Sequence, residues 1–511
     1  MINLKYHTII IGAGVGGLTA AAKLASNGKK VLVLEKIHHI GGTSHVFRRG
    51  EFYFPMGPLS FSYPNFVNKM LREIGITEKI TYSRSHFQLI SPDVDIIYSK
   101  PLSELQKTLI KRFPEEKIGI SRFFSILLEL TNAIKDIYNW DPDYSISKTK
   151  SNAKKKLSEL DKKKYDLVNK YSEVSSKEVL DEFINNSTVK KLLGSQGTYE
   201  PIMSMLHLAF MWNVMSEEGI WFPSCGIHGI NELLYNSILS KGGEIKLNTP
   251  VREIIIEDIY SKGVITEDGT RYSSNYIISN ADYKTTFLNL INNEKVPSEF
   301  YNAIKENSYT GSEICVYLGI EPNNIDLRKV RATHVFYRKK IENAKTRTNN
   351  KFREDFENKE IEICLWSEKS EEFVPKGKKS ILLRVNFPYD IMEPWRTGVK
   401  RRKAGYKEFK NKLADKLINV VEDVLPGLSG SILKREIATP LTYQDWGKRY
   451  RGSIAGWSRD IRKVKAFDRK LLITTPIENL LMAGLYASKE LFLGGYPISM
   501  YTGILAADYI S

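Results

Sequence analysis

A glycine-rich turn near the start of the chain, GAGVGG at residues 12–17, constrains the fold more than any other feature. It follows an apolar run, Tyr6 to Ile11, which is typical of a buried strand. A stretch rich in Ala and Leu, Leu18 to Asn27, favours a helix, and a short Val/Leu run from Lys30 to Leu34 then ends at Glu35. The order strand, glycine turn, helix, strand predicts a βαβ unit.

The spacing of these glycines indicates what the unit binds. Gly12, Gly14 and Gly17 satisfy GxGxxG, in which the first glycine makes a tight turn and the second lets the backbone approach a pyrophosphate. The third lets the helix pack against the strand, and the helix N-terminus faces the negative charge. Glu35, eighteen residues after Gly17, is placed to accept hydrogen bonds from adenosine ribose hydroxyls, which disfavours a 2′-phosphate. The sequence therefore predicts a dinucleotide site that contains Gly12, Gly14, Val15, Gly16, Gly17, Glu35 and Lys36.

Composition limits the remaining possibilities. A chain of 511 residues suggests two or three domains, and 42% hydrophobic residues supply enough apolar surface for a sizeable core. The formal net charge of +16 favours an anionic partner, but the basic residues are not interleaved with aromatic ones as in a nucleic-acid module. We therefore expect an anionic membrane surface, and not nucleic acid, as that partner.

The cysteines and the N-terminal region indicate the compartment. Cys225, Cys315 and Cys364 lie far apart, which argues against a disulfide framework and favours buried thiols in a reducing compartment. The first β-run begins at Tyr6 without signal-peptide features, and no uncharged apolar run of eighteen residues occurs. We expect a cytoplasmic protein, soluble or peripheral on the cytoplasmic face of a membrane, whose oligomeric state the sequence leaves open.

Motifs for hydrolysis and metal chemistry are missing from the sequence. It contains no GxSxG elbow, no HExxH and no Cys/His cluster. His38, His39 and His45 are close in sequence but lack partner spacing, so we interpret them as loop residues and expect no metal. No residue is nominated as a catalytic acid or base.

A second glycine stretch, GGTSHVFRRGEFYFPMGPLSF from Gly41 to Phe61, extends the dinucleotide pattern. It resembles the FAD-dependent superfamily of amine oxidases, phytoene desaturases, carotenoid isomerases and retinol saturases, in which this stretch reads approximately GGxxxxFxxxGFxFDxGP. The matching residues are Gly41, Gly42, Phe47, Gly50, Phe52, Phe54, Gly57 and Pro58, whereas Pro55 replaces the acid. The resemblance implies FAD, with Gly42, Thr43 and Ser44 near its phosphates and ribityl chain and with Met56, Gly57, Pro58 and Leu59 beside the flavin.

The resemblance recurs in order along nearly the whole chain. EGIWFPSCGIHGINELL from Glu218, LNTPVREIIIEDIYSKGVITEDG, IISNAD, ATPLTYQDW, RGSIAGW and the C-terminal LLMAGLYASKELFLGGYPISMYTGILAADYI are each similar to a family segment. By this resemblance the backbone of Val251 contacts adenine, and Asn280 and Ala281 return to the nucleotide. The terminal motif implies further flavin contacts from Gly484, Leu485, Tyr496, Pro497, Ile498 and Ser499.

The expected fold is α/β, with a Rossmann-like FAD-binding domain of the glutathione reductase type and an inserted α+β substrate domain. Four short β-runs in GEIKLNTPVREIIIEDIYSKGVITEDGTRYSSNYIISNA predict a small antiparallel meander within the FAD-binding domain. That domain is expected to comprise residues 1–100, 219–299 and 431–511. The substrate domain is expected to comprise a mainly helical part, residues 101–218, and a mixed part, residues 300–430. The Lys-rich runs from Lys148 and Arg338 are interpreted as a solvated helix face and an exposed insertion.

Two apolar segments bear on the substrate. Pro201 to Ser216, PIMSMLHLAFMWNVMS, lacks Asp, Glu, Lys and Arg, and is either a core helix or an apolar wall above a flavin that suits a long hydrocarbon. The stretch SRFFSILLELTNAI from Ser121 is either core, another wall or a segment that dips into one leaflet. The leading hypothesis is an oxidoreductase that transfers hydride between flavin N5 and a C–C bond of a hydrophobic isoprenoid or polyene lipid.

Two alternatives remain open on the sequence. An FAD-dependent amine oxidase shares the scaffold. A prenyl-binding chaperone similar to Rab GDP-dissociation inhibitors shares the architecture without using flavin, and the intact Gly12, Gly14, Gly17, Glu35 and Gly42 argue against it.

Overall fold

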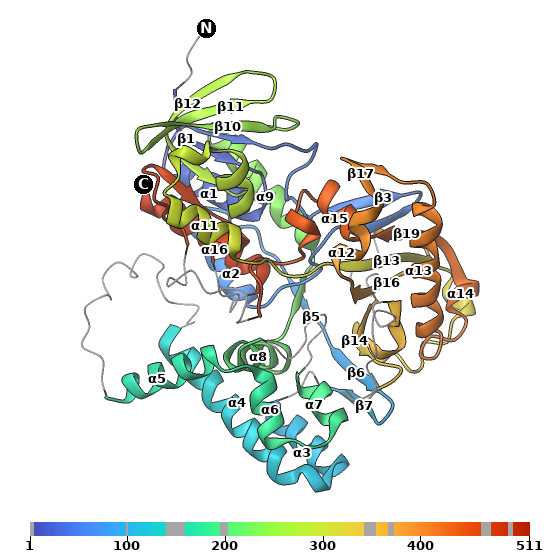
Figure 1. Ribbon diagram of the computed structural model, residues 1–511. Coiled ribbons are helices and arrows are strands. Elements are labelled where there is room, and N and C mark those ends of the chain that lie inside the picture. Colours follow the sequence, from blue (N-terminus) through green and yellow to red (C-terminus); the bar gives the residue numbers. More distant parts are fainter. Residues whose placement is uncertain are drawn as a thin grey trace.

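Two seven-stranded sheets and a separate helical layer organise the chain (Figure 1). A computed structural model describes residues 5–98, 101–138, 159–194, 203–341, 354–365, 373–460, 472–488 and 494–511. The first sheet lies with both chain ends at one side of the molecule, the second sheet lies opposite, and helices α3 to α8 lie below them. The structure is therefore of mixed α/β class.

The centre of the first sheet is parallel. Its strands run in the order β20 (Leu480–Met482), β12 (Arg271–Ser279), β1 (Lys5–Ile11), β2 (Val31–Leu34) and β9 (Glu244–Lys246). Helix α1 (Val15–Ser26) connects β1 to β2, so the βαβ unit expected from the sequence is confirmed. Helices α9 (Gly226–Ser240) and α16 (Gly495–Tyr509) pack against α1, which is why α1 is apolar on nearly every side.

An antiparallel meander extends this sheet, but it has three strands where the sequence suggested four. Strands β10 (Val251–Glu257) and β11 (Tyr260–Thr266) pair with β12, whereas β9 pairs parallel to β2 at the opposite edge. After β9 the chain crosses the end of β2, where the N–H of Asn248 donates to Ile37 O and that of Thr249 to Glu35 O. Because α9 precedes β9, the crossover delivers β9 as a parallel strand, and a hairpin to β10 does not form.

The second sheet has the order β19 (Ile432–Ala438), β13 (Glu313–Ile320), β16 (Lys379–Asn386), β15 (Ile361–Cys364), β14 (His334–Tyr337), β6 (Phe87–Ser91) and β7 (Val94–Ile97). Helix α13 (Tyr406–Val421) shares the apolar core on one face. The hairpin of β3 (Val46–Arg49) and β4 (Phe52–Pro55) shares the core on the other face. Strands β6, β7 and β19 come from segments expected for the FAD-binding domain. They join the second sheet because β6 pairs with β14 and β7, and β19 pairs with β13.

The helical layer packs around a core that it shares with β6, β7 and β14. It contains α3 (Leu102–Arg112), α4 (Lys117–Tyr138), α5 (Glu159–Glu173), α6 (Ser176–Phe183), α7 (Ser187–Gly194) and α8 (Met205–Asn213). Helix α8 packs against α4, α5 and α6, and Trp212 is fully buried there, as the core-helix alternative requires. Of the two Lys-rich runs, residues 148–158 and 342–353 lie outside the described residues. Lys162 and Lys163, in the described part of the first run, are exposed on α5. Within the described ranges, no helix combines the length and the apolar character that crossing a bilayer requires.

Candidate functional site

The residues expected to hold the dinucleotide converge at one edge of the first sheet. The glycine turn follows β1, Glu35 follows β2, Asn280 follows β12, and Gly484 comes two residues after β20. These four strands are parallel, so their carboxyl ends meet at the same edge. Ligands of open parallel sheets bind in the crevice at this edge.

Backbone atoms approach so closely around the glycine turn that side chains have no room. A Cβ at residue 17 would lie 2.1 Å from Gly12 O, and one at residue 16 would lie 2.5 Å from the Gly484 Cα atom. A Cβ at residue 14 would lie 2.6 Å from Asn280 Nδ2. Gly14 is the N-cap of α1 and supplies no side-chain cap, so the first amides of α1 are available to an anion. The turn fits a pyrophosphate.

Glu35 is buried and held in a fixed orientation. Its Oε2 atom accepts a hydrogen bond of 2.7 Å from Ala13 N, and its Oε1 atom accepts one of 3.0 Å from Ile37 N. Each carboxylate oxygen can accept a second hydrogen bond, so both remain able to bind ribose hydroxyls. Lys36 follows on the exposed side of the strand end, and Val251 begins β10 two residues after Thr249, whose N–H donates to Glu35 O.

The paired glycines of the second motif lie against the first. Gly41 and Gly42 have φ values of +83° and +58°, in the left-handed region that favours glycine. The N–H of Gly41 donates to Ala13 O at 2.7 Å, and a Cβ at residue 42 would lie 3.6 Å from the Gly14 Cα atom. The two motifs, separated by 24 residues or more in the chain, therefore form one continuous cradle.

A hydrogen-bond chain connects the second motif to the C-terminal helix. Ser44 O accepts from Asn231 Nδ2 at 2.5 Å, and the Tyr496 hydroxyl donates to Asn231 Oδ1 at 3.0 Å. Tyr496 also stacks on Phe61 with ring centroids 5.1 Å apart. The sequence did not identify Asn231, although it lies within the family-like segment from Glu218. Its amide fixes where the N-terminal turn of α16 lies relative to residue 44.

The remaining expected residues lie at chain turns around this cradle. Gly484 N donates to Thr502 Oγ1 at 2.9 Å, which joins the end of β20 to α16. Leu485 begins the next helical turn, and Pro497, Ile498 and Ser499 form the buried first turn of α16. Ala281 follows Asn280 directly and is half-buried. The hydroxyl of Thr43 accepts a hydrogen bond from Arg449. Thr43 also packs so closely against Gly57 that a Cβ at residue 57 would lie 2.8 Å from Thr43 O.

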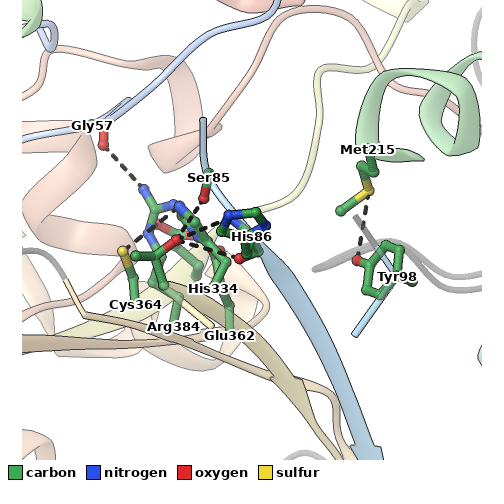
Figure 2. A network of polar contacts seen from close by, with 11 residues as sticks. Gly57, Ser85, His86, Tyr98, Met215, His334, Glu362, Cys364 and Arg384 are labelled. Carbon is green, nitrogen blue, oxygen red and sulfur yellow. Dashed lines mark hydrogen bonds and ion pairs between the residues drawn. The ribbon is translucent and has the colours of Figure 1, made fainter. Parts of the chain in front are cut away.

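The turn from Met56 to Leu59 leads to a polar cluster that the sequence did not reveal. Figure 2 shows Arg384 of β16, Glu362 of β15 and His334 of β14 directed toward one another beside Gly57. Arg384 Nη2 donates to Gly57 O at 3.3 Å and Nη1 donates to Glu362 Oε2 at 3.4 Å. The other carboxylate oxygen, Glu362 Oε1, lies 3.0 Å from His334 Nδ1.

Opposite charges determine the protonation of this cluster. Burial raises the pKa of Glu362, but Arg384 and His334 outweigh it and lower that pKa to about 2. Burial lowers the pKa of His334, but Cys364, whose Sγ lies 3.8 Å from Nε2, and Glu362 raise it to about 10. On the neighbouring strand β13, Glu313 Oε1 lies 3.5 Å from Arg384 Nε and accepts from the Tyr443 hydroxyl at 2.7 Å. At neutral pH Glu362 is therefore ionised and His334 is protonated.

A signal for this cluster was present in the sequence. A charged or titratable side chain stands in each of three largely apolar runs: Arg384 in ILLRVNF, Glu362 in IEICLW and His334 in THVFYR. Such an interruption of a buried strand marks a position that needs a partner. Only the pairing of β14, β15 and β16 reveals that the partners are one another.

The histidines near the second motif lie close to one another. His39 and His45 stack with ring centroids 4.2 Å apart, and burial together with the neighbouring imidazoles of His39 and His228 lowers the pKa of His45 to about 4. In the part of the chain that the structure describes, no group of three or more His, Cys, Asp or Glu residues is arranged to hold a metal ion.

Comparison with known proteins identifies the family of the chain. The profile of the family described as flavin containing amine oxidoreductase matches residues 15–383, well over half of the chain. The chain belongs to this family. It is an FAD-dependent oxidoreductase, and the glycine cradle fits the diphosphate of that cofactor.

The relatives by sequence include carotenoid isomerases and desaturases, while the structural neighbours include amine oxidases. The chain is 26% identical over 532 residues to the chloroplastic prolycopene isomerase of Daucus carota, with 99% of this chain and 80% of that protein covered. It is 24% identical over 528 residues to a 1-hydroxycarotenoid 3,4-desaturase of a Flavobacterium species, with 98% of both chains covered. The cyclohexylamine oxidase of Brevibacterium oxydans superposes with a TM-score of 0.62 at 14% identity, and 99% of each chain is covered. At that identity the likeness shows the fold alone.

Proposed function

We propose that this flavoprotein transfers hydride between flavin N5 and a C–C bond of a hydrophobic isoprenoid or polyene lipid. The reaction would be that of the phytoene desaturases, carotenoid isomerases and retinol saturases. The observation that carries the proposal is the similarity over the full chain to a carotenoid isomerase and a carotenoid desaturase. Retention of the glycine cradle and of the buried Glu35 supports it.

The proposed FAD-binding domain is of the glutathione reductase type and is built on the first sheet with its meander. Residues 101–218 and 300–430 would form the inserted substrate domain, whose mixed part shares the second sheet with β6, β7 and β19. The proposed FAD contacts comprise the cradle, the ribose acid, the flavin turn and the first turn of α16. They are Gly12, Gly14, Val15, Gly16, Gly17, Glu35, Lys36, Gly42, Thr43, Ser44, Met56, Gly57, Pro58, Leu59, Val251, Asn280, Ala281, Gly484, Leu485, Tyr496, Pro497, Ile498 and Ser499.

The protein contributes binding, orientation and exclusion of water. A hydrocarbon C–H bond is far too weak an acid for a carboxylate or imidazole to deprotonate, so the flavin supplies the hydride chemistry when it is bound. The amides at the start of α1 hold the diphosphate, and Glu35 holds the ribose. The helix dipole of α16 places partial positive charge at its first turn, where a negative flavin ring would be stabilised.

The experiment is anaerobic incubation of the purified, FAD-loaded protein with polyenes and their saturated or cis counterparts. Flavin absorbance and the composition of the lipid are followed together. Bleaching of oxidised flavin by a polyene precursor, or isomerisation or saturation of a polyene by reduced protein, is the expected result. If no polyene alters the flavin or is altered itself, the proposal is wrong. Peroxide released from amines in the same assay would establish the amine oxidase alternative.

An anionic membrane surface is the proposed source of the lipid. The hairpin of β17 (Arg396–Gly398) and β18 (Arg401–Arg402) carries Val399 at its tip, 61% exposed, next to Trp446, which is 59% exposed. Lys400 Nζ lies 3.7 Å from the centre of the Trp446 ring. The stretch RTGVKRRK has five basic residues and no acid. Exposed Trp with surrounding Lys and Arg suits an interface with anionic headgroups.

Vesicle sedimentation tests this surface. The protein is expected to sediment with vesicles that contain phosphatidylglycerol and not with phosphatidylcholine alone. The double variant Val399→Asp, Trp446→Ala should lose this binding, while Leu433→Ala, an exposed apolar residue on β19, should keep it. Equal sedimentation of the double variant, or preferential binding of the wild type to RNA, would refute the membrane assignment.

A further inference from the structure

Four ionisable side chains meet on the face of the second sheet that looks toward the Gly57 turn. They are Glu313, Glu362, Arg384 and His334, from four adjacent strands, and Figure 2 shows the last three. Around them are apolar and aromatic side chains of the core shared with the β3–β4 hairpin. Removing charges from water costs several kcal/mol per ion, so such a cluster among packed apolar side chains indicates a functional role.

Two of the four side chains are partly exposed. The exposed fractions of the Arg384 and Glu362 side chains are 20% and 13%, whereas those of His334 and Glu313 are 6% and 4%. Arg384 also donates to Gly57 O, so the cluster lies beside the turn proposed to adjoin the flavin. Arg384 and Glu362 are therefore the members that a bound molecule can touch.

His334 contacts Glu362 from a more deeply buried position. Its ring stacks between Phe87 and Phe222 with centroid separations of 5.2 Å and 5.9 Å. One ring nitrogen faces Glu362 and the other faces the Cys364 thiol.

We propose that Glu362 stabilises positive charge that develops on the polyene during hydride transfer, with Arg384 and His334 as its positioning residues. This rests on the proposed function. When a saturated bond is oxidised, one C–H bond breaks and its hydrogen leaves with both electrons to the oxidised flavin. The carbon skeleton is left with one positive charge, delocalised along the polyene. Loss of a proton from the neighbouring carbon to water then forms the new double bond.

An ionised carboxylate suits this role better than that of a base. A group whose pKa is held low accepts protons poorly, but it keeps its negative charge next to the chain at every physiological pH. The charge is preorganised, because Arg384 and His334 fix both carboxylate oxygens before any substrate binds. Such fixed charges stabilise a developing charge without reorganisation during the reaction.

Binding of a charged analogue tests the inference separately from turnover. The probe is a polyene in which one chain carbon is replaced by a quaternary ammonium nitrogen, compared with the neutral polyene by titration of FAD-loaded protein. The wild type should bind the ammonium probe about 10-fold more tightly than the neutral one. Glu362→Gln should lose this preference while its affinity for the neutral polyene stays within about 2-fold.

Controls separate the charge from the packing. Glu436→Gln on β19 removes a carboxylate of the same sheet that pairs with Arg49, and it should retain the preference. Glu362→Asp keeps the charge at a greater distance and should keep part of the preference; if Glu362→Gln does not fold, this variant decides the question. His334→Phe should weaken the preference without abolishing it, because Arg384 still fixes one oxygen.

The outcomes distinguish the two proposals. An unchanged preference in Glu362→Gln, an unchanged preference in Glu362→Asp when the amide variant is unfolded, or a wild type without any preference overturns the role of Glu362. A wild type that binds neither probe and transforms no polyene overturns the proposed function instead. Loss of kcat with little change in KM for the polyene in Glu362→Gln would support the inference, since the interaction arises only as charge develops.

Discussion

Substitution of Gly17 by alanine tests the packing of α1 against the glycine turn. The added Cβ would lie 2.1 Å from Gly12 O, at least 0.9 Å closer than real Cβ contacts allow. Both atoms belong to backbone, so helix and turn must move apart. Overpacking of this kind costs about 3 kcal/mol of stability. The same displacement moves the amides that would face the diphosphate, and loss of two charged hydrogen bonds weakens FAD binding by about 100-fold.

Titration of apoprotein with FAD, followed by flavin fluorescence, gives the affinity, and thermal unfolding of the apoprotein gives the stability. Two other glycines separate steric contact from backbone strain. A Cβ at residue 28 meets nothing within 4 Å but sits at a φ of +71°, so Gly28→Ala should cost about 1 kcal/mol and leave FAD affinity unchanged. Gly430→Ala, with open space and no positive φ, should leave FAD affinity unchanged and should not lower stability. Wild-type FAD affinity in Gly17→Ala would refute the reasoning.

Three further predictions concern buried charges. Glu35→Gln should weaken FAD binding by about 10-fold or more, since the carboxylate binds a hydroxyl more strongly than an amide does; unchanged affinity in the same titration would contradict the ribose assignment. His334 has a folded pKa of about 10, above its unfolded value of about 6.5, so its stabilising contribution is full below the unfolded value and is lost as pH rises through the folded one. The difference in the free energy of unfolding between wild type and His334→Phe, measured in urea, should therefore narrow from pH 7 toward pH 10. The titratable groups around the ring are Glu362, Glu313, Arg384 and Cys364. A difference that stays constant would contradict this. Asp445→Asn should cost about 3 kcal/mol in urea unfolding, because Asp445 is buried and pairs with Arg396 and Arg402 of the β17–β18 hairpin; a loss below about 1 kcal/mol would show that the pairs contribute little.

Local signals made the cofactor edge predictable from sequence. The βαβ unit depends on three consecutive segments and on glycines whose roles are set by contacts within a few residues or across one turn. Glu35 comes at the end of a strand adjacent to β1, so its position relative to Gly12 follows from parallel pairing alone. The pairing of β9 was mistaken because its three residues carry no periodicity, and only the crossover through α9 determines its partner.

The second sheet could not be predicted from the sequence, because its strands pair over long distances in the chain. Strands β6 and β14 are separated by more than 240 residues in the chain yet pair in register, with Phe87 opposite His334. No local pattern of the sequence indicates this neighbour. The same is true of the cluster around Glu362, whose members come from strands in four separate segments. A charged residue in an apolar strand is visible in the sequence, but its partner is not.

The stretch from Gly41 to Phe61 connects the two sheets, and this explains its composition. At its start, Gly41 N bonds to Ala13 O at the edge of the first sheet. In its middle, the ring of Phe52 lies where a Cβ at residue 319 of β13 would come within 2.6 Å, and Arg49 pairs with Glu436 on β19. Near its end, Gly57 O accepts from Arg384 of β16.

Bare backbone is therefore needed where the stretch leaves one sheet and reaches the polar cluster of the other, and aromatic rings are needed between, where it packs against the second sheet. Because Arg384 binds both Gly57 and Glu362, the contact that orients the flavin turn also orients the proposed charge-stabilising carboxylate. The distance between the reacting carbon and that carboxylate would then be set by one guanidinium. Replacement of Arg384 by lysine, which cannot donate to both groups in a fixed fork, should disturb cofactor and ammonium-probe binding together.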